Sequence, residues 1–199
     1  MKPENDIRRW IFRMRSYTPL PFLAVMVIFA RPTLTSLVAG FAVVLLGELI
    51  RFWGVSIAGS ETRTTGRVGG TYLITNGPFA YVRNPLYLGN MLMYAGIGIM
   101  SMALFPWLLI AAIVWFYVQY YLIVTNEEEY LRGRFGAEYA EYCRNVRRFI
   151  PRPVRYRPSM PSPKGVSPAE GLASERRTLQ AIVLVVAAIV VIYVVRLQG

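Results

Sequence analysis

Five long apolar stretches limit what this chain can fold into. They cover residues 19–30, 34–53, 86–104, 106–124 and 178–196. An α-helix rises about 1.5 Å per residue, so about 20 apolar residues cross the roughly 30 Å hydrocarbon core of a bilayer. The second, third and fourth stretches reach this length, the fifth comes close to it, and the first is short. The pattern predicts an all-α, polytopic membrane protein with about five transmembrane helices.

The composition favours the same class. Hydrophobic residues make up 55% of the 199 residues and charged residues only 17%, whereas about a quarter of an average soluble domain is charged. The Val-rich fifth stretch is also compatible with a buried strand, but an apolar run of this length is more typical of a membrane span.

The positive charges are distributed as in a multi-pass membrane protein. The chain has 22 Lys and Arg against 11 Asp and Glu. If it crosses the bilayer five times from a cytoplasmic N-terminus, all basic residues except Arg31 and Arg196 face the cytoplasm, as the positive-inside rule expects. We therefore predict a multi-pass protein of the inner (cytoplasmic) membrane. The net charge of +11 then reflects basic cytoplasmic segments and does not indicate a nucleic-acid-binding surface.

Two residue types are nearly missing, and this narrows the chemistry. The chain has no histidine and one cysteine, Cys143. Imidazole bases, an intramolecular disulfide and cysteine-based metal cages are therefore excluded.

The stretches divide the chain into three parts. Residues 1–151 hold the first four stretches and form the expected core. Residues 152–177 contain prolines spaced among Ser and Gly, which is typical of an extended linker. Residues 178–196 are an additional C-terminal transmembrane helix.

Polar motifs flank the third and fourth stretches. Arg83-Asn84-Pro85 opens the third stretch, with Pro85 in the first helical turn, and Glu127 and Glu128 follow the fourth. Since the two stretches are nearly equal in length, they form an out-and-back hairpin. We therefore expect a cation, an amide and carboxylates to meet at the cytoplasmic interface.

Residues 127–142 have the pattern of an amphipathic helix. Apolar residues recur at helical spacing: Leu131, Phe135, Tyr139 and Tyr142. Gly133 and Gly136 weaken the helix.

At these residues the chain resembles the isoprenylcysteine carboxyl methyltransferase family and its bacterial and phospholipid methyltransferase relatives. The first signature is Gly-Pro-Phe-Ala-Tyr-Val-Arg-Asn-Pro-Leu-Tyr-Leu-Gly at 77–89, and the second begins at Glu127-Glu128 and ends at Tyr142. The resemblance covers residues 71–151. Two signatures at the right separation are a strong indication.

The resemblance implies S-adenosylmethionine-dependent methyl transfer to a lipophilic acceptor that enters from the bilayer. It implies a cytoplasmic cofactor pocket formed by segments 71–89 and 127–151. Positions that match the family's cofactor-binding residues are Thr71, Tyr72, Leu73, Ile74, Phe79, Asn84, Pro85, Leu86, Tyr87 and Glu127. Arg83 and Glu128 match motif positions beside them and are the expected catalytic residues. The expected partners are lipids, with no metal and no nucleic acid.

The chain departs from the family pattern at two positions. Asn84 stands where the family usually has histidine, although an amide still donates and accepts hydrogen bonds. Ile123 stands where the eukaryotic enzymes carry a substrate-binding arginine, which argues against a prenylcysteine acceptor.

The chemistry favours O-methylation of an isoprenoid- or lipid-like carboxylate. A carboxylate is already ionised and needs no base, whereas an amine would need Glu127 or Glu128 as one. Arg83 can bind a carboxylate of cofactor or substrate through both oxygens. We expect Glu127 to bind the cofactor's amino or ribose hydroxyl groups.

Alternative interpretations remain open. The fold is also compatible with an NADPH-dependent membrane reductase or a non-enzymatic scaffold. Glu127–Glu129 can be a solvated charge run, and Arg83 an interfacial anchor. Glu48 and Arg51 have the spacing of an i,i+3 ion pair. Gly96 and Gly98 are expected to permit close helix packing.

Overall fold

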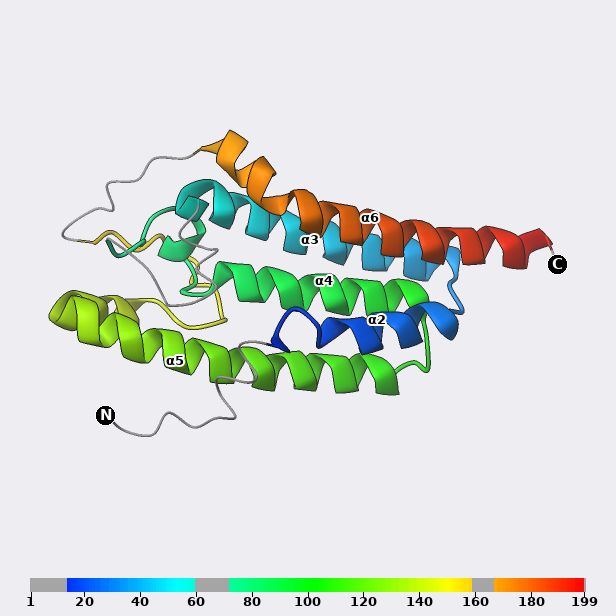
Figure 1. The fold of residues 1–199 in the computed structure, drawn as a ribbon, viewed down its shortest axis with the longest axis horizontal. Helices are drawn as coiled ribbons and strands as arrows, with labels where there is room; N and C mark the ends of the chain where they lie inside the picture. The colour runs from blue at the N-terminus through cyan, green and yellow to red at the C-terminus, as the bar shows by residue number, and fades with distance from the viewer. Residues whose placement is uncertain (1–13, 60–71, 159–166, 199) are drawn as a thin grey trace. The chain divides into compact units, whose positions relative to one another are not determined.

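The computed structural model describes residues 14–59, 72–158 and 167–198, and within these ranges helices joined by loops make up the structure, without strands (Figure 1). The elements are α2 (Pro19–Ile28), α3 (Leu34–Ala58), the 3-10 helix η2 (Gly77–Ala80), α4 (Pro85–Ser101), α5 (Trp107–Asn145) and α6 (Pro168–Gln198). The predicted all-α class is confirmed.

Three of these helices are long and apolar enough to cross a membrane: α3, α5 and α6. Helix α2 has 10 residues and α4 has 17. The total of about five spans therefore stays a prediction for α2 and α4.

The chain divides into two compact units. The first consists of residues 1–47, 91–123 and 178–199, and the second of residues 48–90 and 124–177. The second unit contains both signatures.

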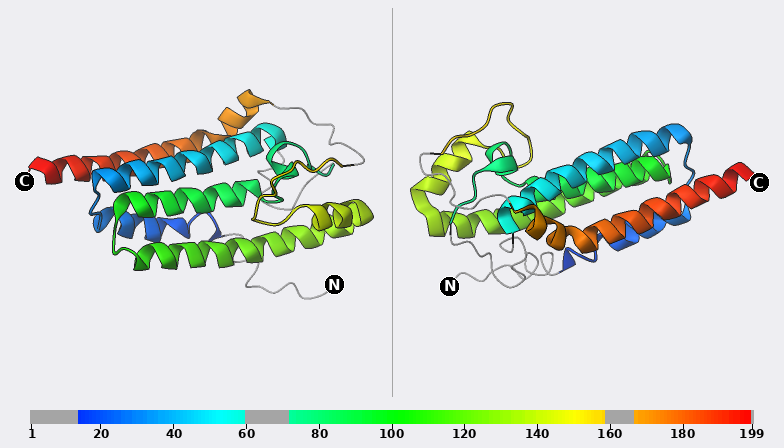
Figure 2. Two further views of the ribbon diagram at one scale, coloured as in Figure 1. Left: turned by 180° about the vertical axis from the view of Figure 1, so that it is seen from behind. Right: turned by 90° about the horizontal axis from the view of Figure 1, so that it is seen from above.

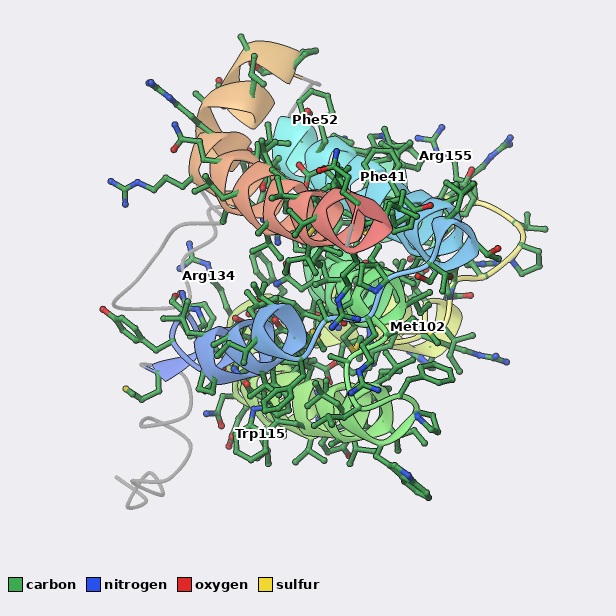
Figure 3. The ribbon with its side chains drawn as sticks, turned by 90° about the vertical axis from the view of Figure 1, so that its right-hand side faces the viewer. Phe41, Phe52, Met102, Trp115, Arg134 and Arg155 are labelled. Carbon is green, nitrogen blue, oxygen red and sulfur yellow. The ribbon has the colours of Figure 1, made fainter. Side chains whose placement is uncertain are left out.

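Aromatic side chains pack the interior of the first unit. Phe116 of α5 stacks on Tyr94 of α4 with ring centroids 4.2 Å apart, and Phe22 of α2 lies 5.4 Å from the same ring. Trp115, the residue before Phe116, is 46% exposed on the outer side of α5 (Figure 3). An apolar surface of this kind fits a lipid solvent.

Glycines allow α4 to lie close to α3 and to α5 in the first unit (Figure 2). A Cβ on Gly40 would lie 2.5 Å from the Gly96 carbonyl oxygen, and a Cβ on Gly98 would lie 2.8 Å from Leu109 Cδ1. Both contacts need a small residue, as is common between membrane helices. The predicted packing role of Gly96 and Gly98 is confirmed.

Helix α6 begins at Pro168, inside the range 152–177 that the composition assigned to a linker. Proline suits the first helical turn because its missing N–H is not needed there. The Gly171 N–H donates to the Ser167 carbonyl at 3.0 Å, and the Ser167 N–H donates to the Ser56 carbonyl at 2.7 Å. The Ser-Pro pair is thus a helix start, and composition alone did not distinguish it from a linker.

Candidate functional site

The first signature is bonded to the segment that follows α5. Four backbone N–H donors make these bonds: Arg83 to the Arg147 carbonyl (2.9 Å), Asn84 to Arg148 (3.2 Å), Arg152 to Tyr81 (2.9 Å) and Tyr156 to Ala80 (3.0 Å). Residues 80–84 and 147–156 therefore hold each other in place, and both signatures lie in one unit.

An apolar cluster lies beneath these bonds. Its buried members are Leu73, Ala80, Tyr139, Tyr142, Val146 and Tyr156, with Leu131 and Phe135 packed against them. All four residues of the predicted amphipathic face thus contribute to this cluster, which confirms that face. The Tyr142 hydroxyl donates to the Phe79 carbonyl at 2.7 Å, which fixes η2 against α5.

Tyr156 closes the cluster from the far side. Its hydroxyl lies 3.3 Å from Glu141 Oε1. Burial, and then the neighbouring Glu141 carboxylate, raise the pKa of the Tyr156 phenol. The phenol therefore stays protonated and remains a hydrogen-bond donor at neutral pH.

Gly136 bends α5 between the two halves of the second signature. Its φ is +50° and its ψ is −118°, a conformation that is essentially restricted to glycine. The predicted weak point at Gly136 is confirmed. After the bend, Tyr139 and Tyr142 face the cluster and the first signature.

Glu128 is the centre of the polar site. Glu128 is 2% exposed, and its Oε1 lies 3.1 Å from Arg83 Nη2. Arg148 approaches both oxygens, with Nε at 3.0 Å from Oε1 and Nη2 at 2.9 Å from Oε2. The exposed Arg132 side chain lies 3.5 Å from Oε2. The predicted convergence of Arg83 with the second signature is confirmed.

This geometry gives Glu128 a positioning function. Both of its oxygens face guanidinium groups, and a buried carboxylate needs such partners. The Nε of Arg83 is buried and has no hydrogen-bond partner among the described residues. Arg83 therefore keeps an unused donor while Glu128 fixes its orientation. The catalytic roles assigned from sequence to Arg83 and Glu128 stay predictions.

Arg148 was not among the residues predicted from sequence. It belongs to a basic run after the second signature, where Arg144, Arg147, Arg152 and Arg155 carry the same charge. In the sequence, such a run is typical of a basic cytoplasmic loop of a membrane protein. Only the structure distinguishes Arg148 from the neighbouring arginines, by its bidentate contact with Glu128.

Two predicted cofactor-binding residues contact each other beside this cluster. The Tyr87 hydroxyl donates to Glu127 Oε1 at 2.7 Å. Asn84, at the family's histidine position, donates from Nδ2 to the Arg148 carbonyl at 3.2 Å. The amide thus supports the segment that carries Arg148.

The other predicted cofactor residues have mixed surroundings. Leu73 is 7% exposed in the apolar cluster. Leu86 packs against Gly54, where an added Cβ would lie 2.9 Å from Leu86 Cδ2. Pro85 is buried, whereas Tyr72, Ile74 and Phe79 are half-buried. Thr71 lies outside the described residues.

A hollow of about 230 Å³ opens in the same unit. Its lining residues are Trp53, Ile57, Asn76, Gly77, Tyr81 and Arg155. It shares the 76–81 stretch with the predicted cofactor pocket but contains no residue of 127–151. That predicted pocket stays a prediction.

A second ion-pair cluster involves α6. Arg51 Nη2 contacts both oxygens of Glu175 at 2.7 and 2.8 Å, and its Nη1 donates to Asn90 Oδ1 at 2.6 Å. The expected pair with Glu48 is present only at 4.0 Å. Sequence reasoning missed Glu175 because it lies in the supposed linker.

The chain is similar to three curated proteins. It is 32% identical over 122 residues to the cobalt-zinc-cadmium resistance protein CzcN of Cupriavidus metallidurans, covering 61% of this chain and 51% of that protein. It is 28% identical over 116 residues to protein-S-isoprenylcysteine O-methyltransferase B of Arabidopsis thaliana, covering 56% of this chain and 57% of that protein.

The third relative is the nickel-cobalt-cadmium resistance protein NccN of Alcaligenes xylosoxydans xylosoxydans, 32% identical over 82 residues, which are 41% of this chain and 37% of that protein. The chain thus spans about half the length of the first two relatives. No solved structure matches it significantly.

The family comparison covers more than half of the chain. The phospholipid methyltransferase family model matches residues 35–138, a range that holds the whole first signature and the Arg83–Glu128 pair. The chain therefore belongs to the phospholipid methyltransferase family, which is related to the isoprenylcysteine methyltransferases.

Proposed function

We propose that the protein is an integral-membrane, S-adenosylmethionine-dependent methyltransferase acting on a lipophilic acceptor, with O-methylation of a carboxylate favoured. The observation that carries the proposal is the Arg83–Glu128 ion pair of 3.1 Å within a chain of the phospholipid methyltransferase family. The protein would lie in the inner membrane with its N-terminus in the cytoplasm.

The residues present fit the cofactor. Arg83 has a buried Nε without a partner among the described residues, which suits the carboxylate of an amino-acid moiety. Glu127, aligned by the Tyr87 hydroxyl at 2.7 Å, suits hydroxyl or amino donors. When bound, S-adenosylmethionine would supply a sulfonium methyl group for transfer to an acceptor carboxylate oxygen, with a neutral thioether as the leaving group.

The work of this chain is then positioning. Glu128, which Arg148 holds in place, contacts the Arg83 guanidinium and fixes its orientation. Correct alignment can supply up to about 7–11 kcal/mol of a displacement barrier. No proton has to leave a carboxylate acceptor, which agrees with a chain that has no histidine.

A phospholipid amine is the second candidate acceptor, since the matching family carries that name. An amine must lose a proton. Because arginines occupy both oxygens of Glu128, Glu127 is the better base of the two.

The test is transfer of labelled methyl from S-adenosylmethionine by the full chain in lipid nanodiscs with a total lipid extract. We expect label in an organic-soluble product, with release by alkali for an ester and retention for an amine. Glu127→Gln should abolish labelling and weaken cofactor binding, whereas the control Glu129→Gln, at an exposed neighbouring position, should not. Saturable NADPH binding would favour a reductase instead, and binding of neither cofactor would favour a scaffold.

A further inference from the structure

Gly77 lines the hollow beside the first signature, where it packs directly against the wall. The walls of the hollow come from the end of α3 (Trp53, Ile57), the 76–81 stretch and Arg155. Gly77 has a φ of +55°, and a Cβ there would clash with Ile57 Cδ1 and lie 3.2 Å from Trp53 Nε1. A side chain at this position would therefore displace the Ile57 and Trp53 walls of the hollow.

The Arg155 guanidinium is the charged group of the lining, and Asn76 adds an amide that both donates and accepts hydrogen bonds. Arg155 is exposed (Figure 3) and forms no ion pair with a carboxylate of the described residues. The indole nitrogen of Trp53 is a donor without acceptor capacity, and no Asp or Glu lines the space. A lining with the Arg155 cation and without a carboxylate favours an anionic ligand.

The remaining walls are apolar. The rings of Trp53 and Tyr81 lie 6.1 Å apart at an angle of 48°, and Ile57 is 1% exposed. A volume of about 230 Å³ is below the roughly 300–1,000 Å³ of sites that enclose a whole drug-sized ligand. The hollow therefore suits a small anionic head with the first part of an apolar chain, and it is small for a nucleoside cofactor.

We propose that this hollow binds the carboxylate head of the lipophilic acceptor, with Arg155 paired to the carboxylate and the chain against Trp53 and Ile57. The inference rests on the proposed function and makes Arg155 a specificity residue for an anionic head. Tyr81, which lines the hollow, lies two positions before Arg83, so one loop carries both the acceptor site and the polar site.

Binding is measured on the full chain in nanodiscs by quenching of tryptophan fluorescence with a stearic acid that carries a nitroxide near its carboxyl group. We expect a saturable component that Trp53→Phe removes. Because charge-assisted hydrogen bonds are the strong ones, Arg155→Gln should weaken this component about tenfold or more. The matched control is Arg157→Gln, since Arg157 is an exposed arginine that does not line the hollow.

Several outcomes would overturn the inference. Equal affinity of the Arg155→Gln and Arg157→Gln variants would do so, as would equal binding of the neutral alcohol analogue. Displacement by inorganic phosphate at similar potency would show that the apolar chain is not recognised. The binding assay needs no methyl transfer, so Arg155-dependent binding without labelling would refute the proposed function alone. Labelling with an unchanged KM for the acceptor in Arg155→Gln would refute this inference alone.

Discussion

Arg83 Nη2 lies 3.1 Å from Glu128 Oε1, although the helical hairpin of α4 and α5 separates the two residues in sequence. The contact joins the first signature to the second. Arg148 takes the remaining positions on the same carboxylate, so one buried anion aligns two guanidinium groups.

Glu128→Gln should destabilise the protein and lower activity together. Without the carboxylate, Arg83 and Arg148 face each other uncompensated, and removal of one partner from a buried ion pair costs about 3–5 kcal/mol. Thermal unfolding in detergent and the labelling assay measure the two effects. The exposed neighbour Glu129→Gln serves as control, and equal stability of both variants would contradict the positioning role.

Gly136→Ala should destabilise α5, whereas Gly133→Ala should not. At Gly136 the φ of +50° is unfavourable for alanine, at a cost of about 1–3 kcal/mol. At Gly133 a Cβ meets nothing within 4 Å, and replacing a helical glycine with alanine gains about 0.5–1 kcal/mol. Denaturation of the two variants side by side tests this, and the same sign for both would refute the bend.

Gly40→Ala should cost more stability than Gly98→Ala. The new methyl of Gly40→Ala would lie 2.5 Å from the Gly96 carbonyl oxygen, a backbone atom, whereas that of Gly98→Ala would meet the movable Leu109 side chain at 2.8 Å. Overpacking of this kind costs about 1–3 kcal/mol. Melting temperatures in one detergent rank the variants, and the reverse order would show that α3 and α4 separate easily.

Glu175→Gln should loosen the start of α6. Glu175 is 1% exposed and holds Arg51 with both oxygens, so its loss leaves a buried cation with Asn90 as its main partner. Hydrogen exchange at residues 168–177 should rise relative to wild type. Arg176→Gln, an exposed position next to Glu175 on the same helix, should leave the exchange unchanged, and a similar rise in both variants would contradict the pairing.

Sequence patterns predicted the contacts that follow from length and periodicity. Equal apolar stretches placed Arg83 near Glu128, and helical spacing placed Tyr139 and Tyr142 on one face. The patterns did not reveal which charges are buried. Arg148 and Glu175 have the same residue types as exposed residues near them in sequence, and only the tertiary fold pairs the half-buried Arg148 with Glu128 and the buried Glu175 with Arg51.

The pair between Arg51 and Glu175 also has a consequence for synthesis on the ribosome. The two residues are 124 positions apart, which corresponds to roughly 6–25 s of elongation at about 5–20 residues per second. Asn90 is made earlier than Glu175, so it is the first of the two partners that Arg51 can meet. The end of α3 therefore acquires its final counter-ion only after translation has entered α6, the last described helix.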